Sequence, residues 1–279
     1  MRILSWNIQF GKSASGNYDL SQTLSHIQSL GEFDVICLQE LARNMEEYCE
    51  PGQSDQLAIS LQHFPGYTPV WGSGFSWAST SGIRSERQEF GNLSLVRSDP
   101  LDYRVHQLPQ PATPGKQQMQ RVAIETVVNS DIGPVSIINT HLAFHDIDEA
   151  QQQLEKFNWL EKERIAHHRF PKQLGMGTYQ EGFLPTARIL CGDFNFTPDT
   201  TQYQYQLDND WLDAWRQSHV DGDRLPTCGI FDEKQWPEGP HCRDYFWLST
   251  GLADHDVTVE VDVCTDLSDH QPIILTLAV

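Results

Sequence analysis

Residues 190–198 read Leu-Cys-Gly-Asp-Phe-Asn-Phe-Thr-Pro, so an apolar run leads into a short polar segment that ends at a proline. An apolar run bounded in this way predicts a buried β-strand. Asp193 and Asn195 occupy alternate positions of the segment that follows. Strand ends hold side chains rigidly while the adjoining loops leave room for a ligand, so both residues are candidates for chemistry.

Four further motifs place polar side chains at the ends of apolar runs. They are Ser-Trp-Asn-Ile-Gln at 5–9, Asp-Val-Ile-Cys-Leu-Gln-Glu at 34–40, Ile-Asn-Thr-His-Leu at 138–142 and Ser-Asp-His-Gln-Pro at 268–272. A weaker element, Arg-Asp-Tyr-Phe-Trp-Leu-Ser, occupies 243–249. We interpret these motifs together, as the parts of one site.

The spacing of apolar residues predicts a mixed α/β domain. Apolar, β-rich runs are expected as strands at 3–8, 35–38, 92–97, 122–128, 135–139, 189–191, 245–248, 257–263 and 273–279. Helices are expected at 18–30 and 148–168, where apolar residues recur at three- and four-residue steps, and Asp146 or Asp148 is expected to cap the second.

Long polar segments separate these elements. Loops are expected at 44–55, 72–89, 108–118, 170–186 and 221–243, and loops of this length in a compact domain are often functional. The predicted strands and helices neither alternate strictly, as in a βαβ fold, nor form an all-β domain. Their order favours a single domain over residues 1–279, with two sheets packed face to face and helices outside.

The charge of the chain argues against one class of partner. The 279 residues carry a formal charge of -19. Proteins that bind long duplex DNA without specificity usually present a basic face, because counterion release supplies most of the affinity. Among possible ligands, the composition therefore favours a small phosphodiester, or a mechanism in which a metal ion supplies the positive charge.

The six cysteines form no CxxC pair and no zinc-ribbon spacing. Cys37 and Cys191 lie within apolar runs and are expected as buried thiols, whereas Cys228 and Cys242 flank a Gly/Pro-rich loop and are close enough in sequence to pair. Neither a secretory signal nor a membrane-spanning run of apolar residues is visible. A reduced, cytoplasmic protein is the expectation.

The polar motifs supply the groups that phosphoryl transfer needs. Glu40 and Asp269, helped by Asn7, offer the oxygen ligands that Mg²⁺ prefers. Asp193 beside Asn195 can deprotonate and orient a water molecule, although the same residues alone would also suit an Asx turn. His141 and His270 can donate hydrogen bonds to phosphate oxygens.

In this order, the motifs WNxQ, LQE, NTHL, GDFNxxP and SDHxP resemble the endonuclease/exonuclease/phosphatase superfamily over residues 1–279. The resemblance implies a four-layered α/β sandwich with two central, mostly antiparallel sheets flanked by helices. It implies a Mg²⁺- or Mn²⁺-dependent phosphoester hydrolase. Glu40 would be the main metal ligand, with Asn7 and Asp269 beside it.

The resemblance also assigns roles to the remaining candidates. Asp193 would activate water, Asn195 would hold it, and His270 would polarise the phosphate. His141 would assist the leaving oxygen. The family resemblance further makes Asp244 the carboxylate that orients His270. Arg121 and Asn92 would contact the substrate phosphate.

Two departures from the family pattern indicate which branch of the superfamily the chain resembles. Gln9 stands where abasic-site endonucleases often carry an acid, and His141 stands where that branch has a tyrosine. The chain is therefore nearer to the deoxyribonucleases, sphingomyelinases and broad phosphatases. A phosphodiester is the leading substrate. DNA, a lipid head group, an inositol phosphate and a non-catalytic binding role stay as alternatives, and a monomer without a stable protein partner is expected.

Overall fold

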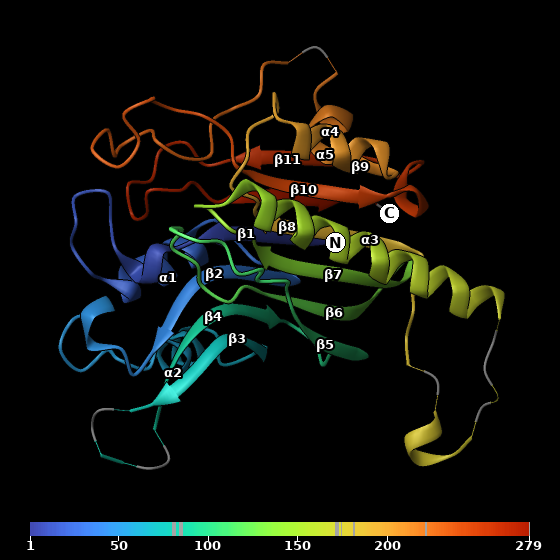
Figure 1. Cartoon of the computed structure of the whole chain (residues 1–279), viewed down its shortest axis with the longest axis horizontal. Helices are drawn as coiled ribbons and strands as arrows, with labels where there is room; N and C mark the ends of the chain where they lie inside the picture. Colours follow the sequence, from blue (N-terminus) through green and yellow to red (C-terminus); the bar gives the residue numbers. More distant parts are fainter. Residues whose placement is uncertain are drawn as a thin grey trace.

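The computed structural model describes residues 1–79, 82–83, 86–170, 173, 175–180, 182–220 and 222–278 (Figure 1). Within them, two six-stranded sheets lie face to face. The first sheet runs in the order β11 (Val257–Val261), β12 (Ile273–Leu277), β1 (Arg2–Asn7), β2 (Val35–Arg43), β4 (Arg87–Val96) and β3 (Thr68–Ala78). The second runs in the order β5 (Asp102–Gln107), β6 (Val122–Ser130), β7 (Gly133–His141), β8 (Ala187–Asp193), β10 (Asp244–Ser249) and β9 (Trp211–Asp213).

Each sheet is antiparallel except at one central pair. β1 pairs with β2 in parallel in the first sheet, and β7 pairs with β8 in parallel in the second. Parallel neighbours end at the same edge, so Asn7 of β1 lies opposite Gln39 of β2, and His141 of β7 lies opposite Asp193 of β8. The polar strand ends of four motifs are thereby gathered at one end of the sandwich.

The alternation along β1 shows how the layers form. Ile3 faces the core between the two sheets, where it packs with residues such as Ile137 and Phe246. Leu4 and Trp6 face the opposite way, into the core beneath the helices of the first sheet. Successive side chains of a strand point to opposite faces, so one apolar strand contributes to two layers of core.

Helices cover the outer face of each sheet. α1 (Leu20–Ser29) and α2 (Gln56–His63) cover the first sheet, and α3 (Ile147–Arg169), α4 (Thr201–Asp208) and α5 (Ala214–Ser218) lie over or beside the second (Figure 1). Short 3₁₀ turns occupy Gln9–Gly11, Glu46–Tyr48, Gly177–Tyr179 and Thr250–Leu252. The four layers and the two mostly antiparallel sheets confirm the predicted fold class.

The two predicted helices are present, and Asp146 caps the second by accepting a hydrogen bond from the backbone of Asp148. The predicted loop at 72–89 is wrong over residues 72–78 and 87–89, because β3 continues to Ala78 and β4 begins at Arg87. Trp77, which falls within the predicted loop, lies in β3. The sequence also gave no expectation of β5, β9, α2, α4 or α5.

Two further expectations can be compared with the structure. All six cysteines are free, with Cys228 and Cys242 both buried. Among the helices described, none is long and apolar enough to cross a bilayer. The cytoplasmic location stays a prediction, and Val279, expected in the last strand, lies outside the described residues.

Candidate active site

Two backbone distortions present acidic and amide side chains at the end of the sandwich. The register between β2 and β4 shifts between Leu38 and Leu41, and Glu40 lies in this bulge with φ 59°. Asn195 follows β8 with φ 55°. Left-handed backbone is uncommon for residues other than glycine and is concentrated at functional sites. In β2 the bulge breaks the simple alternation of side chains just where Glu40 emerges.

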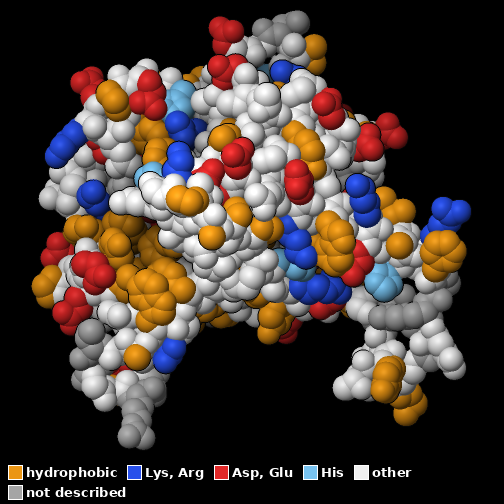
Figure 2. Space-filling model, in the orientation of Figure 1, with side chains coloured by type: hydrophobic (Ala, Val, Ile, Leu, Met, Phe, Trp, Pro, Cys, Tyr) orange, Lys and Arg blue, Asp and Glu red, His pale blue; other side chains and the backbone are white. Residues whose placement is uncertain are grey.

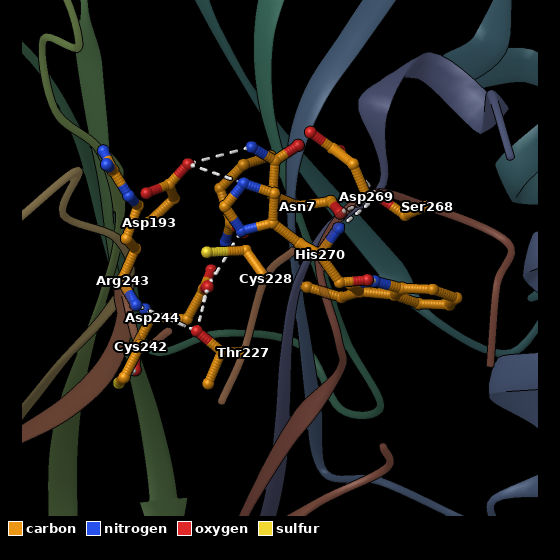
Figure 3. Close-up of polar contacts among 12 residues, drawn as sticks. Asn7, Asp193, Thr227, Cys228, Cys242, Arg243, Asp244, Ser268, Asp269 and His270 are labelled. Atoms are coloured by element: carbon orange, nitrogen blue, oxygen red, sulfur yellow. Dashed lines mark hydrogen bonds and ion pairs between the residues drawn. The ribbon is translucent and has the colours of Figure 1, made fainter. Parts of the chain in front are cut away.

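Asp193 is the centre of the polar network (Figure 3). Its Oδ2 accepts a hydrogen bond from Asn7 Nδ2 at 3.0 Å and lies 3.4 Å from His141 Nε2 and 3.5 Å from His270 Nε2. Its Oδ1 accepts the backbone N–H of Asn195 at 2.9 Å. The carboxylate is buried, so these groups orient it firmly.

His270 is held from behind by a second buried acid. Its Nδ1 lies 2.8 Å from Asp244 Oδ2, and the same oxygen accepts the Thr227 hydroxyl at 2.6 Å (Figure 3). Asp244 comes from the start of β10, opposite Asp193 in the adjacent strand. The ring of His270 is thus fixed with Nε2 facing Asp193.

Asp269 precedes His270 and is held by the loop at 221–243. Its Oδ2 accepts Gln235 Nε2 at 2.6 Å and Trp236 Nε1 at 3.2 Å. The Trp236 ring meets the His270 ring edge-on, with centroids 5.8 Å apart. The long loop therefore shapes one wall of the site.

Burial and neighbouring charges shift the pKa values of the two acids Glu40 and Asp193 in opposite directions. Desolvation, with the negative charge of Asp269, raises the pKa of Glu40 to about 7. Desolvation by burial also acts to raise the pKa of Asp193, but His270 and His141 outweigh it and the net pKa is lowered. Asp193 is therefore ionised at neutral pH, as a general base must be.

The two histidines are shifted in opposite directions. Burial acts to lower the pKa of His270, but Asp244, Asp193 and Asp269 outweigh it and raise the pKa well above its ordinary value. Burial and the charge of Arg121 lower the pKa of His141 well below its ordinary value. His270 is thus the cationic histidine of the pair.

These side chains surround one small cleft. Its lining comprises Glu40, Arg121, His141, Phe144, His145, Asp193, Asn195, Gln235, Trp236, Asp269 and His270. Two more predicted residues, Asn7 and Asp244, lie directly behind the lining and contact it. Nine of the ten residues predicted from the sequence therefore meet at one place.

Asn92 is the predicted residue that the structure does not bring to the cleft. It is buried in β4, opposite Gly72 of β3, and its Nδ2 donates to the carbonyl of Val122 at 3.0 Å. Its position in the β4 register directs the amide to the backbone of β6. Asn92 thus joins the two sheets behind Arg121 and does not line the site.

The oxygen donors of Glu40, Asp269 and Asn7 suit a hard divalent cation. Among the described residues, the side chain that donates a hydrogen bond to Glu40 is Asn7, at 3.2 Å, so most of the carboxylate is free for another ligand. Two acids close together without a cation raise one another's pKa, as Asp269 does to Glu40. A second buried cluster, Asp193, Asp244 and His270, brings its ligand atoms within 4.8 Å of one another. There, both ring nitrogens of His270 already face carboxylates.

Sequence reasoning missed several residues of the site. Gln235, Trp236, Phe144 and His145 line the cleft, and no motif in the sequence singled them out as site residues. Phe144 and His145 directly follow the Ile-Asn-Thr-His-Leu motif, and Gln235 lies in a long loop, which are the signals that could have identified them. The contacts of Gln235 and Trp236 with Asp269 depend on how that loop folds back.

Taken together, the cleft offers an ionised base, a cationic histidine, a buried arginine and oxygen ligands. Phosphoryl transfer requires mainly such positioning and charge neutralisation. The cleft can therefore orient a water molecule against a phosphorus atom.

Comparison with known proteins supports this interpretation. The model of the Endonuclease/Exonuclease/phosphatase family matches residues 4–270. No curated protein matches the chain. Among solved structures, an endonuclease/exonuclease/phosphatase from Beutenbergia cavernae has a TM-score of 0.69 at 20% identity, over 100% of this chain and 71% of that one.

Two other similar structures carry more specific descriptions. A mannosyl-6-phosphatase of Bacteroides thetaiotaomicron has a TM-score of 0.66 at 17% identity, and the similarity covers 100% of both chains. A 3′ phosphatase of Neisseria, bound to a product DNA hairpin, has a TM-score of 0.60 at 20% identity, again over 100% of both chains. At these identities the similarity shows the fold.

Proposed function

Because the chain belongs to the endonuclease/exonuclease/phosphatase family, we propose that it hydrolyses phosphoesters with an activated water molecule and Mg²⁺ or Mn²⁺. The observation that carries the proposal is the arrangement around Asp193. An ionised, buried carboxylate lies beside Asn195 and within 3.5 Å of a histidine that is itself paired with a second acid.

Each side chain then has a defined task. Asp193 accepts the proton of the attacking water, and Asn195 holds that water or a phosphate oxygen in line. His270, kept protonated by Asp244, donates from Nε2 to a phosphate oxygen and opposes its growing negative charge. His141 faces the same space from the other side of Asp193 and supports the leaving oxygen.

Glu40, with Asn7 and Asp269, would hold the cation. Once bound, Mg²⁺ or Mn²⁺ neutralises charge on the phosphate and fixes its orientation. The chain itself would act as a monomer.

A phosphodiester is our first choice of substrate, as expected from the sequence. A monoester is the second choice, favoured by the small, polar cleft and by the two phosphatases with the same fold. The charge of -19 disfavours long DNA as a general substrate.

A lipid head group is favoured by a separate observation. Hydrophobic side chains gather over the β3–β4 hairpin (Figure 2). There Trp77 is 57% exposed and stacks on Phe75 with centroids 3.9 Å apart. If this aromatic surface enters a lipid interface, replacing Phe75 and Trp77 with serine will reduce binding to phosphatidylcholine–sphingomyelin vesicles; unchanged binding would remove the lipid alternative.

The deciding experiment is hydrolysis of bis-p-nitrophenyl phosphate and p-nitrophenyl phosphate with Mg²⁺, Mn²⁺ or EDTA. We expect metal-dependent turnover that Asp193→Asn and Glu40→Gln each reduce by roughly two orders of magnitude or more while the fold is kept. Asp254→Asn is the matched control, because Asp254 is exposed in the turn beyond the opposite end of β10. Full activity in both site variants would overturn the assignment, and faster cleavage of the monoester would favour a phosphatase.

A further inference from the structure

Arg121 makes an unusual contact for a residue expected to bind phosphate. Its Nη1 lies 3.0 Å from Nδ1 of His141. A guanidinium group has donors and no acceptor, and it keeps its proton in proteins. Nδ1 of His141 must therefore accept this hydrogen bond, and a neutral ring must carry its proton on Nε2.

The groups on the other side of the ring agree with this tautomer. Nε2 of His141 lies 3.4 Å from Asp193 Oδ2, which is an acceptor. Glu40 Oε1 lies 3.8 Å from Nδ1, beyond hydrogen-bonding distance. The Arg121 guanidinium therefore donates to Nδ1 of His141, and Nε2 of the same ring carries its proton on the side that faces Asp193.

The two histidines of the site consequently have partners of opposite charge at Nδ1. His270 presents Nδ1 to the carboxylate of Asp244, which requires a proton on Nδ1 if the acid is ionised. His141 presents Nδ1 to a permanent cation, which requires that Nδ1 have no proton. At Nδ1, therefore, His270 has an acid within hydrogen-bonding distance, whereas His141 has a cation.

The backbone that carries Arg121 is held from several directions. The Arg121 carbonyl accepts hydrogen bonds from the Leu108 backbone at 3.0 Å and from Gln120 Nε2 at 2.9 Å. The next carbonyl, of Val122, accepts Asn92 Nδ2 at 3.0 Å. These hydrogen bonds fix the backbone from which the Arg121 side chain extends towards His141.

A glycine makes room for this segment. A Cβ built on Gly74 of β3 would lie 2.2 Å from the carbonyl oxygen of Gln120, so only glycine lets β3 approach the residue before Arg121 so closely. The edge of the first sheet therefore helps to hold the segment that carries Arg121.

We propose that Arg121 is a positioning residue that fixes His141 as the Nε2–H tautomer, with that proton directed into the cleft. His141 then acts as a hydrogen-bond donor and not as a proton acceptor. The catalytic consequence rests on the proposed hydrolysis, whereas the tautomer itself does not.

The first test reads the tautomer directly, in ¹⁵N-labelled, metal-free protein. Long-range ¹H–¹⁵N correlation is expected to show His141 with Nε2 protonated and Nδ1 unprotonated, and with Nδ1 shifted by its hydrogen bond. Arg121→Met should abolish that shift. Arg243→Met is the matched control, because Arg243 Nε lies 2.7 Å from His241 Nε2, so its loss should shift the His241 signal and leave Nδ1 of His141 unchanged.

The wild-type spectrum alone can overturn the proposal, whether or not the variants fold. A protonated Nδ1 on His141 would do so. So would a Nδ1 signal that Arg121→Met leaves unchanged.

The second test is a double-mutant cycle on bis-p-nitrophenyl phosphate with Mg²⁺. A residue that acts only through His141 should lower kcat by about 10–100-fold with little change in KM, as residues that orient an active-site histidine do. In the His141→Ala background, Arg121→Met should then have almost no further effect. Additive losses, or a rise in KM alone, would instead assign Arg121 to direct phosphate binding. Failure of wild-type turnover would count against the proposed function and leave the spectroscopic test to decide the tautomer.

Discussion

Asn7 Nδ2 lies 3.0 Å from Asp193 Oδ2, although the two residues are 186 positions apart and belong to different sheets. The same nitrogen lies 3.2 Å from Glu40 Oε1. One amide therefore joins the expected metal ligand to the expected base, across the space between the sheets.

Asn7→Ala should consequently impair activity more than stability. The two carboxylates would lose their shared donor and take up other orientations, and loss of one positioned donor costs roughly 100–1,000-fold in kcat. Steady-state kinetics beside Asn17→Ala, an exposed loop residue, would check this. A loss below about threefold would show that Asn7 does not orient Asp193.

Asp244→Asn should lower kcat sharply while the protein stays folded. The amide keeps the shape of the carboxyl group but removes the negative charge that orients His270 and keeps its ring protonated. A drop on the order of 10²–10⁴-fold is expected, with a flatter pH profile for the remaining activity. Thr227→Ser keeps the hydroxyl that contacts Asp244 and should stay within a few fold of wild type. Equal losses in the two variants would point to general disruption of the loop.

Gly192→Ala should destabilise the protein and displace Asp193. A Cβ at Gly192 would lie 1.8 Å from the carbonyl oxygen of Thr140, and the residue has φ 135°. Gly133→Ala is the control, since Gly133 has φ 96° but open space around it. We expect about 1 kcal/mol from the strained φ at Gly133 and at least 2–3 kcal/mol more at Gly192, measured by urea unfolding. Similar costs at both positions would contradict the steric account.

A buried amide pair between the sheets should behave as a unit. Gln39 Nε2 donates to Asn139 Oδ1 at 2.8 Å, and both residues are fully buried. Gln39→Leu leaves Asn139 with an unpaired acceptor, so a loss of about 1–3 kcal/mol in unfolding free energy is expected. Replacing both residues with leucine should cost less than the sum of the two single losses, because neither amide is then left without its partner. A double variant with the simple sum of the two single losses would argue against coupling.

Glu125 should make stability depend on pH in the acid range. Burial opposes ionisation, but His106, Arg188 and Ser136 outweigh it and lower the pKa of Glu125 to about 2 from an ordinary value of 4.5. Its stabilising contribution is therefore complete above pH 4.5 and disappears as the pH falls towards 2. The difference in unfolding free energy between wild type and Glu125→Gln should be constant near neutrality and shrink through that window. A difference that stays constant to pH 2 would contradict the lowered pKa.

The sequence by itself predicted the elements with regular patterns and local signals. The alternation in residues 3–8 and the apolar run before Asp193 indicated strands, because a half-buried or buried strand needs those patterns. β3 escaped prediction because it contains Gly72 and Gly74, and glycine has a low strand propensity. The small size of Gly74 is required by close approach to the Gln120 carbonyl, and that of Gly72 by the side chain of Ile124.

The sequence also determined which residue types were available for the site, since the acids, amides and histidines stand at strand ends. Only the tertiary structure decided that Arg121 faces His141, that Trp236 holds Asp269 and that Asn92 turns away from the cleft. The spacing of apolar residues indicates which face of its own strand or helix a residue occupies. Contacts between segments dozens to hundreds of residues apart depend on strand order, bulges and loop paths, and these are set by the packing of the two sheets together.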